Sequence, residues 1–114
     1  MMKPILIVSP WFTKLVSVVI DVYAITLFPF IISKEPMGPE TLNHETIHIK
    51  QQAELFVIFF YLLYVAYYFI GLVKYKDKQK AYYMIPFEQE AYEYDNQLDY
   101  LETRKPYSWT KYKV

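Results

Sequence analysis

The segment Pro39-Glu40-Thr41-Leu42-Asn43-His44-Glu45-Thr46-Ile47-His48 predicts a helix on which the rest of the architecture depends. Proline directly after Gly38 suits the first helical position, and Glu40 places a negative charge where the helix dipole favours one. His44 and His48 are the only histidines of the chain. Residues four apart lie on the same face of a helix, so both imidazoles are expected to reach one metal ion.

Toward the C-terminus this helix is expected to continue into a long apolar stretch. No proline or glycine occurs from Glu40 to Ile70, and Leu55–Val73 contains no charged residue. A charge-free run of this length passes the usual threshold for a membrane span. Hydrophobic residues make up 54% of the 114 residues, which is high for a small soluble domain. The sequence therefore predicts a membrane-associated protein.

On the N-terminal side, β-branched residues dominate. They are dense in Ile5–Val8 and across Leu15–Ile32, which favours strand over helix. We predict a strand pair or bent ribbon over Leu15–Ile32. The alternative is a first membrane helix over Leu15–Ser33, although that stretch contains Asp21 and Pro29.

The C-terminal part is predicted to hold a second helix. Lys74–Lys80 is a basic connector, and Pro86 opens a helix over roughly Phe87–Arg104. Its apolar positions recur at spacings of 4, 3, 4 and 3 and form a stripe that should pack on the first helix: Phe87, Ala91, Tyr94, Leu98 and Leu101. The expected fold is one α+β, mainly α, domain over residues 1–114. It has an N-terminal β-ribbon, a long zinc-binding and apolar helix, and a second, antiparallel amphipathic helix.

The two histidines and Glu45 form an H-E-x-x-H motif, which is typical of zinc hydrolases. Catalytic zinc usually takes three protein ligands and a water. With no cysteine and no third histidine, the third ligand must be a carboxylate, and acidic residues concentrate in 87–95. On a helix, Glu90 lies about 60° from the centre of the apolar stripe and Glu88 about 100° on the other side. Periodicity thus favours Glu90 as the buried carboxylate.

Together with Glu88-Gln89-Glu90-Ala91, the motif resembles the gluzincins, zinc peptidases with H-E-x-x-H on one helix and a glutamate on a second. The likeness is to their membrane-associated branch, whose second motif reads E-x-x-A-D. It implies Glu88 as the third ligand, with Glu90 as the runner-up. Tyr92 stands where that branch has aspartate, so the role of that aspartate is either unfilled or taken by Asp95 or Asp21. The string through Gln51 also resembles the H-E-x-x-H-x-x-Q form of small bacterial peptidase-like proteins.

The resemblance implies a zinc-dependent peptidase that cleaves a peptide or protein substrate. Glu45 would act as general base on a zinc-bound water and then as general acid. Candidate donors to the oxyanion are Tyr82, Tyr83, Tyr92 and Arg104. For Arg104, an ordinary cation near a helix C-terminus is the simpler interpretation. The alternative function is a non-catalytic accessory subunit of a bacterial membrane protein complex that retains the metal motif.

Partners and location follow from charge and hydropathy. Lysine plus arginine balance aspartate plus glutamate at 12 each, so nothing points to nucleic acid. A membrane or membrane-protein partner and the bacterial envelope are expected. If Leu55–Val73 simply crossed a bilayer, the histidines and Glu88 would lie on opposite sides. A single zinc site therefore requires the connector to return along the helix, or the apolar run to bend into a hairpin.

Overall fold

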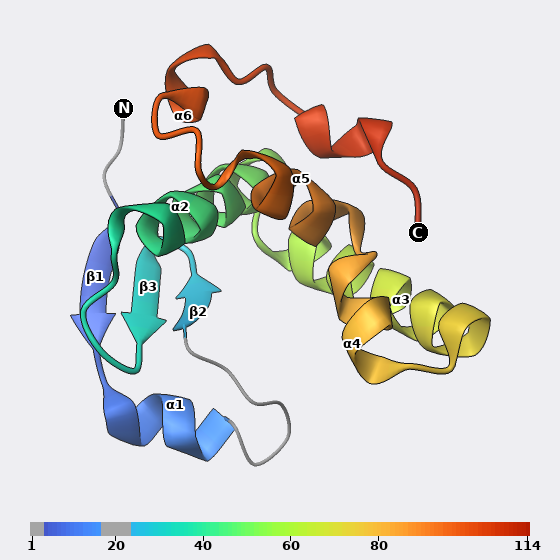
Figure 1. Ribbon diagram of the computed structural model, residues 1–114, viewed down its shortest axis with the longest axis horizontal. Helices are drawn as coiled ribbons and strands as arrows, with labels where there is room; N and C mark the ends of the chain where they lie inside the picture. The colour runs from blue at the N-terminus through green and yellow to red at the C-terminus, as the bar shows by residue number, and fades with distance from the viewer. Residues whose placement is uncertain (1–3, 17–23) are drawn as a thin grey trace.

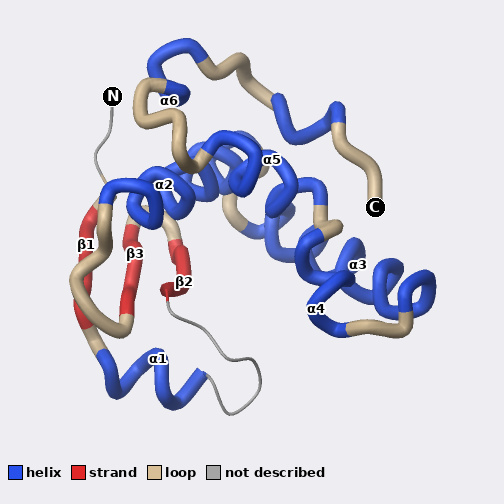
Figure 2. Tube along the Cα trace, in the orientation of Figure 1, coloured by secondary structure: helices blue, strands red, loops and turns tan. Residues whose placement is uncertain are grey.

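The computed structural model describes residues 4–16 and 24–114, which form an α+β fold dominated by helices (Figure 1). The sheet lies at one end of the molecule and α3 and α4 at the other, while α2 and α5 lie between them (Figures 1 and 2). The elements, in chain order, are β1 Ile5–Val8, α1 Pro10–Val16, β2 Ala24–Leu27, β3 Phe30–Ser33, α2 Pro39–Glu54, α3 Ile58–Tyr75, α4 Lys78–Tyr83, α5 Pro86–Tyr94, α6 Tyr100–Thr103 and the 3₁₀ helix η1 Ser108–Lys111.

The sheet has the strand order β1-β3-β2. β2 and β3 pair antiparallel, with Ala24 opposite Ser33, and this confirms the strand pair predicted in this part of the chain. β1 joins parallel to β3, with Ile5 opposite Phe30. The alternative of a first membrane helix is wrong for the described residues, because 24–27 and 30–33 are strands. The part of that prediction in residues 17–23, including Asp21, lies outside the described residues.

Helix α2 begins as predicted and ends earlier than predicted. Gly38 is its N-cap and Pro39 occupies its first turn. The chain leaves the helix after Glu54, and Phe56 and Val57 adopt positive φ angles of 54° and 65°. The Ile58 amide donates to the Phe56 carbonyl at 2.6 Å, which makes a tight γ-turn around Val57. The expected continuous helix from the motif into the apolar run is therefore wrong.

Tertiary contacts on both sides of the turn explain this break. The Gln52 side chain, from α2, donates to the Thr26 carbonyl of β2 at 2.9 Å and accepts from the Phe28 amide at 2.8 Å. Tyr61, from α3, donates its hydroxyl to the same Thr26 carbonyl at 2.7 Å. Both helices are thereby fixed to one strand end, and a straight helix cannot make both contacts.

Beyond α3 the chain turns back along it. Asp77 caps α4 by accepting from the backbone amides of Gln79 and Lys80, so part of the predicted basic connector is a helix. Gly71 lets α3 and α4 approach closely, since a Cβ at this position would lie 3.0 Å from the Ala81 Cα and Cβ. The return along the helix, one of the two arrangements that the site required, is the one found.

Helix α5 begins at Pro86, as predicted, and runs antiparallel to α2. Its length was predicted wrongly, because the helix ends at Tyr94 rather than Arg104 and α6 is separate. Phe87 and Ala91 of the predicted stripe are fully buried, whereas Leu98 is 59% exposed beyond the helix end. Two core clusters result: Phe60, Ile85, Phe87 and Trp109 in one, and Ile47, Ala91 and Tyr100 in the other.

Candidate metal centre

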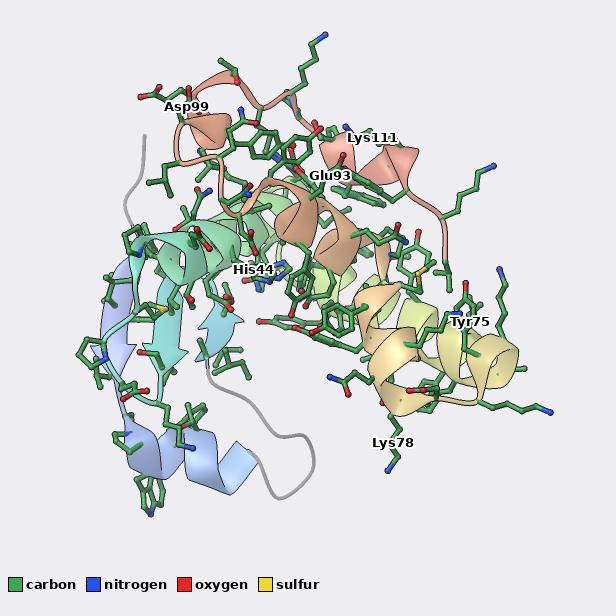
Figure 3. All side chains as sticks on the ribbon, viewed as in Figure 1. His44, Tyr75, Lys78, Glu93, Asp99 and Lys111 are labelled. Atoms are coloured by element: carbon green, nitrogen blue, oxygen red, sulfur yellow. The ribbon has the colours of Figure 1, made fainter. Side chains whose placement is uncertain are left out.

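The face of α2 that is turned toward α5 carries both histidines, and both side chains are buried. Their Nε2 atoms point to the same carboxylate oxygen, Oε1 of Glu88, at 3.1 Å from His44 and 3.0 Å from His48. Glu88 lies in the first turn of α5 and is also buried. Figure 3 shows the His44 side chain in the space between the two helices.

These three side chains have the donor set of a zinc site. One ligand atom from each lies within 4.8 Å of the other two. In a tetrahedral site with zinc–ligand bonds near 2.0–2.1 Å, ligand atoms stand about 3.3 Å apart. The Nε2–Oε1 separations therefore need to widen by only a few tenths of an ångström. Within the described residues three side chains could hold the ion, and such a set would leave the fourth position open, as in catalytic rather than structural zinc sites.

Each imidazole is oriented by a second contact at Nδ1. Asp95 Oδ2 lies 3.3 Å from Nδ1 of His44, and Gln51 Oε1 lies 2.7 Å from Nδ1 of His48. Gln51 is itself fixed, because its amide donates to the Phe87 carbonyl at 3.0 Å. Donation from Nδ1–H leaves the Nε2 lone pair free for a metal. Asp95, one turn beyond Tyr92, is thus the carboxylate beside Nδ1 of His44.

The second oxygen of Glu88 is also bonded. Tyr64, from α3, donates its hydroxyl to Oε2 of Glu88 at 2.6 Å. From sequence, Tyr64 is a packing residue, and no spacing signal links it to the motif across the unpredicted α2–α3 turn. Gln51 did carry a signal, since it follows His48 by three residues on the same helix.

The buried ligands favour a positive charge between them. Burial alone would raise the pKa of Glu88, but the two histidines outweigh it and hold that pKa well below its usual value. Burial alone would lower the pKa of His48, but Glu88 raises it to about 9. In the metal-free chain a proton on His48 supplies positive charge beside Glu88, and a divalent cation would supply more.

Glu45 lies beside the ligands and does not join them. The Thr26 hydroxyl of β2 donates to its Oε2, which holds this carboxylate at the edge of the sheet. Burial raises the pKa of Glu45, partly countered by His48 and His44. A raised pKa brings a carboxylate closer to the range useful for a general base at neutral pH. Neither strand β2 nor Thr26 figured in the sequence-based site.

Glu90, the runner-up ligand, lies outside the centre. It is fully buried, as the periodicity indicated, but it faces Arg104, whose Nε donates to Oε2 of Glu90 at 2.6 Å. Tyr100 donates to the same oxygen at 2.6 Å. Arg104 also donates from Nη1 to Glu54 at 2.9 Å. The structure therefore uses Arg104 in a buried ion-pair network rather than at a site where an oxyanion would form.

Of the tyrosines considered as oxyanion donors, Tyr92 lies beside a ligand. Its ring packs edge-on against the His44 ring, with centroids 4.4 Å apart. The Tyr92 hydroxyl donates to that of Tyr82 at 3.3 Å, and the Tyr83 ring lies 4.7 Å from that of Tyr92. Tyr92 and Tyr83 are also solvent-exposed. The rings of these three tyrosines are in contact with one another on the Tyr92 side of the centre.

The chain matches no protein-family model, no curated protein and no solved structure. The resemblance to gluzincins therefore depends on the residues of the centre alone and stays a prediction.

Proposed function

We propose that this protein is a zinc-dependent peptidase in which His44, His48 and Glu88 hold the ion. The observation that carries the proposal is the convergence of both Nε2 atoms on one oxygen of Glu88, within 3.1 Å. Two features favour catalysis over a structural staple. In residues 4–16 and 24–114 the set supplies three ligands rather than four, and a glutamate outside the set lies next to it.

When bound, zinc would act as a Lewis acid that lowers the pKa of a water in its open position to about 7. In this proposal Glu45 takes a proton from the attacking water and delivers it to the leaving amine. Thr26 holds one oxygen of Glu45 and leaves the other for this transfer. Two tyrosines are candidate donors to the developing oxyanion. One is Tyr92, and the other is Tyr82, whose hydroxyl accepts from Tyr92 and keeps its own O–H to donate.

The test compares Glu45→Gln with a matched control, Glu40→Gln, which changes an exposed glutamate in the first turn of the same helix. Zinc content is measured by elemental analysis, and cleavage of a diverse peptide mixture by mass spectrometry. The proposal expects one zinc per chain in all three proteins and loss of cleavage in Glu45→Gln alone. If wild type binds zinc but cleaves nothing, the accessory-subunit alternative is supported instead. Absence of zinc from the wild type overturns the peptidase proposal.

A further inference from the structure

One face of α3 is apolar along its whole length and is largely exposed. Its large side chains are about half exposed or more, although they belong to the longest helix of the described chain. They recur at helical spacing and form what is called here the outer stripe: Ile58, Phe59, Leu62, Val65, Phe69, Ile70 and Val73. The stripe extends about 22 Å along the helix axis. Such a continuous exposed apolar surface marks an interaction site.

The opposite face of α3 is the one that packs inside the molecule. Phe60 is buried against Phe87, with ring centroids 4.5 Å apart, and Tyr64 reaches Glu88. The apolar stripe is therefore not the core face of this helix. The helix is long and apolar enough to cross a membrane, but only 11% of it is buried.

A cluster of lysines lies at the C-terminal end of the stripe. It consists of Lys74, Lys76, Lys78 and Lys80, all exposed, with Asp77 the one acidic residue among them. The Asp77 carboxylate is engaged by the α4 N-terminus. In Figure 3 the Lys78 side chain extends away from the helices into open space. The chain as a whole has no net charge, so this cluster is a local positive surface.

We propose that α3 docks in the plane of an anionic lipid bilayer, with the outer stripe in the acyl boundary and the lysine cluster on headgroup phosphates. Apolar stripes flanked by lysines bind membrane surfaces in this way. A protein partner fits less well, because protein interfaces carry a hydrogen bond for every 100–200 Å² and the stripe offers no side-chain donor or acceptor.

The fold argues for docking in the plane rather than spanning. Helix α4 packs on the inner face of α3, and α5 contacts that face through Phe87 and Glu88. Helix α5 and the η1 helix packed on it carry exposed charges, among them Glu93 and Lys111. A transmembrane α3 would draw these charges into hydrocarbon, which strongly disfavours them. Docked in the plane, the helix keeps them on the aqueous side.

Docking in the plane also determines where the candidate metal centre would lie relative to the bilayer. Glu88 contacts the inner face of α3 through Tyr64, so a helix diameter of about 10 Å separates the centre from the stripe. The centre would face water just above the membrane, where it could reach polypeptide close to the bilayer. The docking itself does not depend on whether the centre hydrolyses peptides.

The first test is flotation of the full chain with vesicles of phosphatidylglycerol or of phosphatidylcholine alone. We expect binding to the anionic vesicles that weakens with salt, and loss of binding in Leu62→Ser/Val65→Ser/Phe69→Ser. Leu98→Ser, at an exposed apolar residue away from α3, is the matched control and should bind as wild type. Circular dichroism checks that each variant is folded. The proposal is overturned if folded wild type does not float with anionic vesicles. It is also overturned if wild type is a soluble dimer that the triple substitution converts to monomers.

The second test distinguishes the lysine cluster from the outer stripe and measures how deeply α3 lies in the bilayer. Lys76→Gln/Lys78→Gln should weaken binding to anionic vesicles by roughly fivefold for each lysine removed. Equal binding of this variant and of wild type contradicts the role of the lysine cluster. A fluorescent label is then attached to Leu62→Cys, which supplies one thiol in a chain that has no cysteine, and is quenched by lipids brominated at different depths. Quenching strongest near the headgroup end of the acyl chain supports in-plane docking, and quenching strongest at the bilayer centre overturns it.

Discussion

Every ligand atom of the centre belongs to a side chain whose other polar atom is bonded elsewhere. Asp95 and Gln51 orient the imidazoles, and Tyr64 holds the free oxygen of Glu88. Contacts of this kind fix ring orientation and tautomer before the metal arrives. Zinc affinity should therefore respond to residues that never touch the ion.

Asp95→Asn tests this at the contact to His44. Loss of the carboxylate charge beside Nδ1 should lower zinc affinity about 10–100-fold, as outer-shell substitutions typically do. Affinity is measured by competition with a chromophoric chelator. Asp99→Asn is the matched control, because Asp99 is exposed and its side chain caps nothing. An unchanged affinity in Asp95→Asn would show that its 3.3 Å contact does not orient the ring.

For individual residues, the sequence was informative where the chemistry depends on the spacing of side chains along one helix. The positions of His44 and His48 follow from four-residue spacing on one helix, and the structure brings Glu88 to them. The choice between Glu88 and Glu90 depended on which face of α5 meets α2, which periodicity could not define. Glu90 is buried for a different reason, because it pairs with Arg104.

Among the elements, the turn between α2 and α3 is the least expected. Val57 is β-branched and has φ 65° and ψ −57°, a combination that side chains of this shape rarely adopt. Such strain persists only where surrounding contacts impose it, and here the bonds from Gln52 and Tyr61 to Thr26 do so.

Val57→Gly should therefore raise the free energy of unfolding by about 1 kcal/mol. Relief of about 1–3 kcal/mol of backbone strain exceeds the entropy that glycine adds to the unfolded chain. The measurement is urea denaturation followed by circular dichroism. Val65→Gly, exposed in the middle of α3, is the control and should destabilise by several tenths of a kcal/mol. Destabilisation by Val57→Gly as well would mean that the turn is not strained.

Helix starts were predicted better than helix ends. Pro39 and Pro86 fix two starts locally, and Asp77 would have revealed a third as an N-cap. The ends of α2 and α5 carry no glycine or proline signal. They are set by contacts with β2 and with the C-terminal segment, which are distant in sequence.

At the scale of the whole molecule, Arg104 links segments that are distant in sequence. Its guanidinium pairs with Glu54 at the end of α2 and with Glu90 in α5, and its side chain is almost fully buried. These pairs attach the segment after α5 to both helices of the metal centre. Paired charges in such surroundings are costly to separate.

Arg104→Ala should lower the free energy of unfolding by about 3–5 kcal/mol, because it leaves the buried Glu90 carboxylate without its opposite charge. Chemical denaturation measures the change. Lys105→Ala, at the exposed neighbouring residue, should change stability by no more than about 0.5 kcal/mol. Arg104→Met/Glu90→Gln should cost less than the sum of its single changes, since both charges are removed together. A strictly additive double variant would argue against the pairing.

Zinc should stabilise the fold as a whole, because its ligands come from α2 and from α5. At a free zinc concentration of 100 times Kd the expected gain is about 2.7 kcal/mol. Thermal unfolding with and without chelator measures it, and His48→Ala provides a control whose melting temperature should not respond to zinc. A wild type insensitive to chelator would show that the histidines and Glu88 hold no ion.

The return of the chain along α3 has one more consequence. Glu88 reaches the histidines only after 40 further residues have been made and folded back, so the three candidate ligands cannot meet before residue 88 has been synthesised. A nascent chain that stops short of Glu88 would carry the H-E-x-x-H motif without its third candidate ligand. Any metal held by all three side chains would thus be bound only after α5 has formed.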